Sequence, residues 1–131
     1  MAWEVDGVVK LVGFTASADL STHQYKFVKI SGVQTVTVCA AATDRPIGVL
    51  QNAPTSGQAA EVCIVGISKV SSDAALARDV LIGTSADGQA DAKTPGTDTT
   101  EYVCGVVLIA TGAAGDLATC LIDCMAPHRA A

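Results

Sequence analysis

The 131-residue chain is long enough for one domain with a buried core, because a chain of this length removes about two thirds of its unfolded surface from water. Half of its residues are apolar but 4% are aromatic, so the core must be built from aliphatic side chains and cysteine. With 16% charged residues and a formal net charge of −5, the chain lacks the cationic surface that a phosphate backbone requires, and we expect no nucleic acid partner.

The first residues of the sequence do not resemble a secretory signal, so we expect a protein that is not exported by that route. Glu4 and Asp6 stand where a secretory signal carries basic residues, and no continuous apolar stretch follows them. Every hydrophobic run ends well before the roughly 18 apolar residues of a membrane span. We therefore expect a protein made in the cytoplasm, with no membrane partner.

Residues 1–14 are interpreted as an N-terminal arm that leads into the first strand. Trp3 is the only tryptophan, and it lies in a terminal segment where no core is certain to hold it. Tryptophan is enriched at the centres of protein interfaces. Trp3 and Val5 are therefore the candidate interface residues, with packing of Trp3 on its own domain as the alternative.

Short runs rich in Val, Ile and Thr alternate with clusters of Gly, Pro, Asn, Asp and Ser, a pattern typical of strands and turns. In the run from Val33, Val36 and Val38 share one face and Thr35 and Thr37 the other, which is the period of a half-buried strand. Residues 24–30 alternate less cleanly, so both faces of that strand are expected to be partly covered. Eight strands are predicted, over residues 8–14, 24–30, 33–40, 47–51, 60–70, 80–83, 102–109 and 117–123.

The connecting segments predict little helix. Residues 16–24, with Ser17 or Asp19 as a cap, and residues 73–78 are each expected to form one or two short helical turns. Residues 88–100 are polar and contain Pro95 and Gly96, which predicts an exposed loop. The fold class predicted is all-β, a small sandwich or barrel, with a single β domain over residues 15–126 and a flexible C-terminal tail over residues 127–131.

The sequence contains one internal similarity. Residues 47–53 and 104–110 match, and the same offset aligns Gly48 with Gly105 and Cys63 with Cys120. Both copies are interpreted as a strand, a loop of small residues and a second strand. We therefore expect two hairpins of similar geometry.

Five cysteines are an odd number, and the first four lie inside apolar runs, where a thiol behaves as a small hydrophobe. We expect reduced, buried thiols. Cys120 and Cys124 have the spacing of half a metal site, but zinc needs four ligands and the two histidines lie far away in the sequence. The sequence therefore predicts neither a metal nor any other cofactor.

No catalytic constellation is recognisable. A serine or cysteine nucleophile would need His23 or His128 as its base, and neither has a convincing partner in the sequence. The acidic pairs, such as Asp87 with Asp91, lie in turn-like contexts, where carboxylates commonly cap loops. We expect no enzyme activity and no small-molecule substrate.

The chain is apolar for a small protein, with a mean hydropathy of +0.42. A surplus of apolar surface is covered by partners in many proteins of this size. This favours a protein that functions by binding other protein surfaces.

Four segments resemble a family of small tailed-bacteriophage proteins known as capsid decoration or cement proteins. The similarity extends from about Phe14 to the C-terminus and lies in strands and turns rather than in catalytic residues. The segments that carry it are residues 18–32 (ADLSTHQYKFVKISG), 42–52 (ATDRPIGVLQN), 59–70 (AAEVCIVGISKV) and 82–90 (IGTSADGQA).

The resemblance implies a structural protein of the virion that sits on the outer capsid surface. It also implies a homotrimer that clamps neighbouring copies of the major capsid protein, made in the host cytoplasm. The alternative is another virion module, such as a tail-tube or head-completion protein. A small hydrolase or a carbohydrate-binding module is a weaker rival, because sugar sites use exposed aromatic side chains, of which this chain has few.

Overall fold

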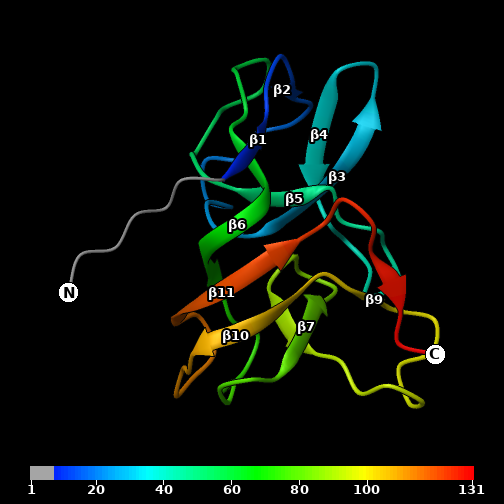
Figure 1. Ribbon diagram of the computed structural model, residues 1–131. Helices are drawn as coiled ribbons and strands as arrows, with labels where there is room; N and C mark the ends of the chain where they lie inside the picture. Colours follow the sequence, from blue (N-terminus) through cyan, green and yellow to red (C-terminus); the bar gives the residue numbers. More distant parts are fainter. Residues whose placement is uncertain (1–7) are drawn as a thin grey trace.

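The computed structural model describes residues 8–131, and these residues fold into twelve strands without a helix (Figure 1). The all-β prediction is confirmed. The strands are β1 (Val9–Leu11), β2 (Thr15–Ala16), β3 (Phe27–Gly32), β4 (Thr35–Val38), β5 (Gly48–Leu50), β6 (Val62–Ser71), β7 (Leu81–Thr84), β8 (Ala90–Ala92), β9 (Tyr102–Val103), β10 (Gly105–Ile109), β11 (Leu117–Asp123) and β12 (His128–Arg129).

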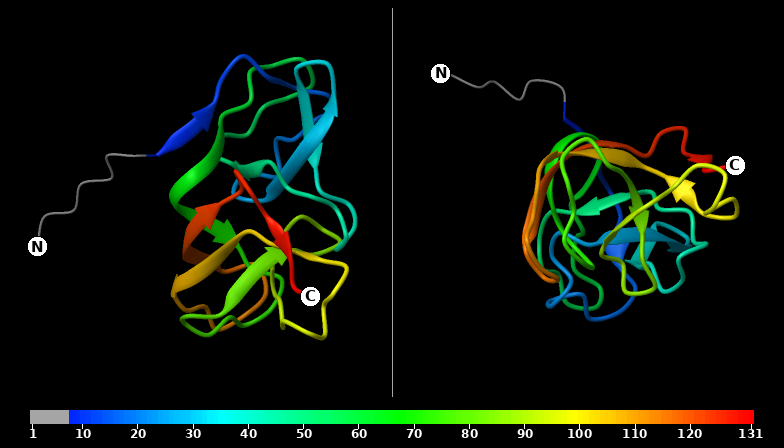
Figure 2. Two further views of the ribbon diagram at one scale, coloured as in Figure 1. Left: turned by 45° about the vertical axis from the view of Figure 1, so that its right-hand side comes forward. Right: turned by 90° about the horizontal axis from the view of Figure 1, so that it is seen from below.

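Ten of these strands form one mixed sheet in the order β2-β4-β3-β5-β6-β11-β10-β7-β8, with β1 also paired to β6. The pairing of β2 with β4 is parallel and the others in this sheet are antiparallel. The remaining two strands, β9 and β12, pair with each other. Figure 2 shows that the sheet curls round on itself, so its strands enclose the interior from several sides.

The buried side chains form two clusters on either side of the central strands. One cluster gathers around β7, β10 and β11, and its members are Phe27, Cys39, Val49, Val70, Leu76, Ile82, Ala90, Cys104, Val107, Ala118, Cys120, Ile122 and Cys124. The other gathers around β2, β3 and β4, and its members are Ala16, Leu20, Val28, Val36, Leu50, Ala60 and Val62.

Strands β3 and β5 supply side chains to both clusters. Phe27 and Val49 point into one cluster, while their neighbours Val28 and Leu50 point into the other. All four are fully buried, because successive side chains of a strand point to opposite faces and both faces are covered here. The prediction that both faces of residues 24–30 are covered is confirmed at Phe27 and Val28.

The two predicted helical segments are turns instead. In the first, Leu20 is buried and its backbone amide donates to the Pro54 carbonyl at 2.9 Å, and the segment forms bends and turns instead of helical turns. In the second, Leu76 exchanges two backbone hydrogen bonds with Thr111, so this segment is held extended in a β-bridge. Tertiary contacts at single buried leucines therefore decide both conformations.

The loop predicted over residues 88–100 is exposed only in part. Its first residues form β8, whose Ala90 is fully buried, and Lys93 is 3% exposed. The Lys93 ammonium donates to the Thr84 carbonyl at 2.9 Å and pairs with the carboxylates of Glu101 at 3.0 Å and Asp91 at 3.2 Å. This buried ion cluster ties β7, β8 and the segment before β9 together.

The C-terminal residues also differ from the prediction of a flexible tail over residues 127–131. His128 and Arg129 pair with β9, and the Ala130 amide donates to the Glu101 carbonyl at 2.9 Å. Ala130 is 2% exposed, and the Arg129 guanidinium lies 5.6 Å from the centre of the Tyr102 ring. These contacts come from residues some 25 positions earlier, and for that reason the local sequence did not predict them.

The two similar segments form two antiparallel pairs, β5 with β6 and β10 with β11. A side chain at Gly48 or Gly105 would collide with a backbone carbonyl of the partner strand, from Cys63 and Leu121 respectively. The registers differ by one residue, because Cys63 pairs with Val49 whereas Cys120 pairs with Val107. The expected similarity therefore holds for the strand pairs and not for their register.

We predict that Lys93→Met destabilises the fold by about 3 kcal/mol, because the substitution leaves the partly buried Glu101 carboxylate without its cation. Urea unfolding followed by circular dichroism measures this loss. Lys10→Met, at an exposed lysine of β1, is the matched control and should change the free energy of unfolding by less than about 0.5 kcal/mol. Equal stability of the two variants would contradict the structural role of Lys93.

Candidate interaction surface

Large apolar side chains remain exposed on the described part of the chain, and half of them lie on β7, β10 and β11. A side chain such as Leu121 is 45% exposed, although its neighbours in the strand are buried. Contiguous exposed apolar surface of this kind marks interaction sites more often than scattered single residues do. The ten residues are Val9, Val12, Ile30, Val33, Leu81, Leu108, Ile109, Leu117, Leu121 and Met125.

The strand register places four apolar residues in one continuous line. Leu121 of β11 is the Cα partner of Ile67 on β6 and of Val106 on β10, and Val106 is the partner of Leu81 on β7. Directly paired residues point to the same face of a sheet. We call these four residues, Ile67, Leu121, Val106 and Leu81, the outer apolar row.

The sequence of β11 explains why this row faces outward. Ala118, Cys120 and Ile122 are buried, whereas Leu117, Leu121 and Asp123 are exposed. The small side chains of Ala118 and Cys120 pack inside one of the two clusters, and the larger leucines lie on the opposite face. The strand therefore carries apolar residues on both faces.

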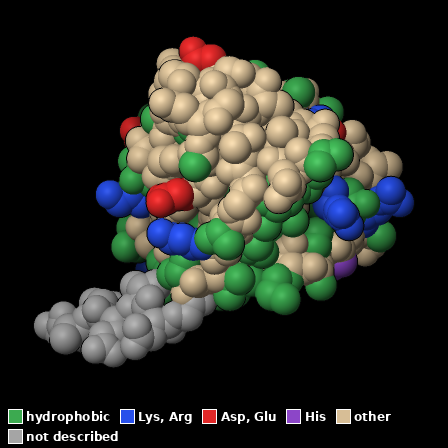
Figure 3. Space-filling model, turned by 90° about the horizontal axis from the view of Figure 1, so that it is seen from above, with side chains coloured by type: hydrophobic (Ala, Val, Ile, Leu, Met, Phe, Trp, Pro, Cys, Tyr) green, Lys and Arg blue, Asp and Glu red, His purple; other side chains and the backbone are tan. Residues whose placement is uncertain are grey.

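A shallow hollow of about 220 Å³ lies along the row. It is lined by Leu81, Val106 and Leu121 of the row and by Val103, Gly105, Asp123, Ala126 and His128. Figure 3, a view from above, shows hydrophobic side chains gathered along one side of the molecule. The face that carries the row is both apolar and indented.

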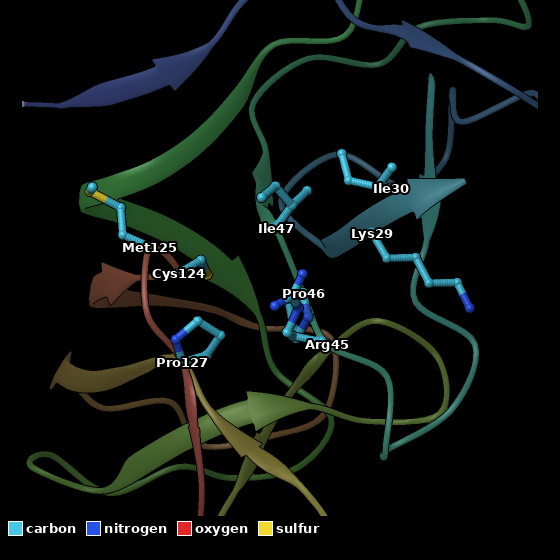
Figure 4. Close-up of a pocket in the computed structure, with 8 residues that line it drawn as sticks. All are labelled: Lys29, Ile30, Arg45, Pro46, Ile47, Cys124, Met125 and Pro127. Carbon is cyan, nitrogen blue, oxygen red and sulfur yellow. The ribbon is translucent and has the colours of Figure 1, made fainter. Parts of the chain in front are cut away.

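A second groove, of about 270 Å³, lies between β3 and the segment that follows β11 (Figure 4). Ile30 and Met125 line it on opposite sides, and the exposed Arg45 lies between them. Lys29 also lines the groove, but its ammonium is held by Asp44 at 2.8 Å. Burial alone would raise the pKa of Asp44, but hydrogen bonds from Lys29 and from two backbone amides together outweigh burial. The pKa of Asp44 is therefore lowered from its ordinary value.

The predicted interface residues Trp3 and Val5 lie outside the described residues. The described chain begins close to one end of the outer apolar row, because Val65 of β6 is the Cα partner of both Val9 and Asp123. Asp123 is two residues from Leu121 on the same face of β11. The interface role of Trp3 and Val5 stays a prediction, and the sequence analysis did not identify the outer apolar row.

His23, Cys39 and Asp87 line one hollow, and these are residue types found in the catalytic triads of cysteine hydrolases. The geometry does not activate them. The buried Nδ1 atom of His23 has no hydrogen-bond partner among residues 8–131, and burial lowers the pKa of this imidazole. Burial also raises the pKa of Cys39 to about 12, which disfavours a nucleophilic thiolate.

All five cysteines are buried and unbridged, so the prediction of burial is confirmed. Burial raises the pKa of Cys120 to about 11 and also raises that of Cys63, while a hydrogen bond with Cys104, followed by burial, raises that of Cys124. Over residues 8–131, no three side chains of His, Cys, Asp or Glu gather as a metal site would require. In the same range no helix has the length and apolar character needed to cross a membrane.

Comparison with known proteins defines a class of fold. The structure is similar to the crystal structure of the head fiber gp8.5 N base of bacteriophage phi29, with a TM-score of 0.66 and 18% sequence identity. The match covers 88% of this chain and 94% of that one. No protein-family model matches the sequence, and no curated protein matches it. At this identity the comparison establishes a shared all-β fold.

The thiols generate a direct prediction. At pH 8 the folded chain should react with iodoacetamide slowly at every cysteine, because burial shields all five sulfurs. A raised pKa also keeps the thiols of Cys39, Cys63, Cys120 and Cys124 protonated. Intact-mass spectrometry should show five rapid additions after unfolding in guanidinium. Rapid modification of any cysteine in the folded chain would contradict the burial seen here.

Proposed function

We propose that this chain is a structural protein of a bacteriophage virion that binds the outer surface of the capsid. There it clamps neighbouring copies of the major capsid protein, acts as a homotrimer and stabilises the shell. It is made in the host cytoplasm and carries out no catalysis.

The observation that carries this proposal is the shared fold with the phi29 head fiber base, which extends over nearly the whole length of both chains. A phage head protein with this fold supports a location on the capsid. The resemblance of four segments to decoration proteins points the same way, since those proteins bind the outer shell. The outer apolar row, with Leu81 and Leu121 exposed and Ile67 and Val106 half-buried, supports binding to protein rather than to small molecules.

The clamp would act through thermodynamic linkage. A protein that binds the assembled, expanded shell and not its separated subunits stabilises the shell by mass action. A trimer that bridges several capsid subunits gains further affinity, because the second and third contacts form within one complex. Modest contacts at each joint are then enough to oppose the pressure of the packaged genome.

The same structural comparison favours a second function, the base of a head fiber. A fiber base must bind the shell but need not stabilise it. The measurement that separates the two is the temperature at which shells rupture, with and without saturating protein. A clamp raises this temperature, whereas a simple attachment base leaves it unchanged.

Co-sedimentation with expanded, undecorated shells tests the proposal as a whole. We expect the purified chain to pellet with shells at a fixed ratio to the major capsid protein, and decorated shells to survive heating or osmotic shock that breaks bare ones. A chain that does not bind shells and forms rings in solution would favour a tail-tube or head-completion role instead.

Trp3→Ala tests whether the N-terminal arm contributes to attachment. If Trp3 is an interface anchor, the substitution should weaken shell binding about tenfold or more while the melting temperature of the free protein stays nearly unchanged. Thr99→Ala, at an exposed residue between β8 and β9, is the control and should bind normally. A large loss of domain stability in Trp3→Ala would instead place this side chain in its own core.

A further inference from the structure

The outer apolar row has a charged residue of opposite sign on each flank. Asp123 lies two residues from Leu121 on β11, and Lys69 lies two residues from Ile67 on β6. Residues two apart in a strand share a face, so both charges lie on the face that carries the row. Asp123 pairs in register with Val65 and Lys69 with Thr119, on opposite sides of the row.

These two charges cannot neutralise each other within one copy. The pair of Asp123 with Val65 and the pair of Lys69 with Thr119 are four residues apart along the strands, or about 13 Å at roughly 3.3 Å per residue. Within residues 8–131 neither side chain forms a salt bridge. The Lys69 ammonium lies 5.9 Å from the centre of the Tyr25 ring, and a side-chain oxygen of Asp123 accepts from the Met125 amide at 3.2 Å.

We infer that this face is the surface through which copies of the chain contact one another. In a ring of three, the faces surround the symmetry axis and the apolar rows point toward it. The Asp123 flank of each copy then meets the Lys69 flank of the next. Such a head-to-tail contact joins two different, complementary flanks, and it closes into a ring when the rotation between neighbours completes one full turn after three copies.

The inference rests on the proposed homotrimer and adds the face and the charge pair that form it. A second copy is the occupant that the face itself specifies, because it supplies both an apolar row to cover the hollow and the opposite charge for each flank. It also leaves β2 to β5, on the other side of the sheet order, free for the capsid.

Charge reversal on the full chain tests the inference. Light scattering after size-exclusion chromatography should find the wild type at three times the mass of one chain. Asp123→Lys and Lys69→Glu should each raise the dissociation constant of the trimer at least about tenfold, because like charges then meet at every contact. The double variant, with the charges exchanged, should return to within about threefold of the wild type.

Two further variants keep the result interpretable. Leu121→Glu, in the middle of the row, should give a folded monomer, whereas Val33→Glu, at an exposed apolar residue away from the face, should remain trimeric. Circular dichroism and melting temperature check that each variant is folded.

A monomeric wild type, unaffected single reversals or a double variant that is not restored would each overturn the inference. Shell binding is measured separately by co-sedimentation. A wild type that pellets with shells while its charge reversals leave the trimer intact would reject this face and keep the proposed function. A trimer that shows the expected charge dependence but does not bind shells would keep this face and reject the proposed function.

Discussion

The fold depends on β5 and on the first two residues of β3, which are buried on both faces. Phe27 and Val28, and likewise Val49 and Leu50, send neighbouring side chains into different clusters, so neither cluster can form without these strands. Strand β6 extends this arrangement, because Val62 belongs to one cluster and Val70 to the other. A chain with few aromatic residues thereby builds two small aliphatic cores on one continuous sheet.

This arrangement accounts for the exposed face. At the outer apolar row, β6, β11, β10 and β7 are fully covered on the inner side only, and small residues such as Ala118 and Cys120 let that side pack closely. Gly105 has no room for a side chain, because β11 approaches it so closely. The opposite side is left with larger apolar residues, and the outer apolar row is the result. The face is therefore a product of the same packing that holds the sheet together.

The alternation of Val and Thr was enough to predict all-β structure and the places of the long strands. It did not predict β8 or β12, whose pairing depends on Lys93, Glu101 and Ala130, residues distant from their partners. The outer apolar row was also missed. In β11 both faces carry apolar residues, so the sequence cannot say which of Leu121 and Ile122 is inside until the neighbouring strands are placed.

Electron cryomicroscopy of expanded shells incubated with the purified chain tests the account most directly. The account predicts trimeric density on the outer capsid surface, into which residues 8–131 fit with β6, β11, β10 and β7 facing the three-fold axis. Shells that remain bare, or bound copies whose outer apolar row stays open to solvent, would contradict it.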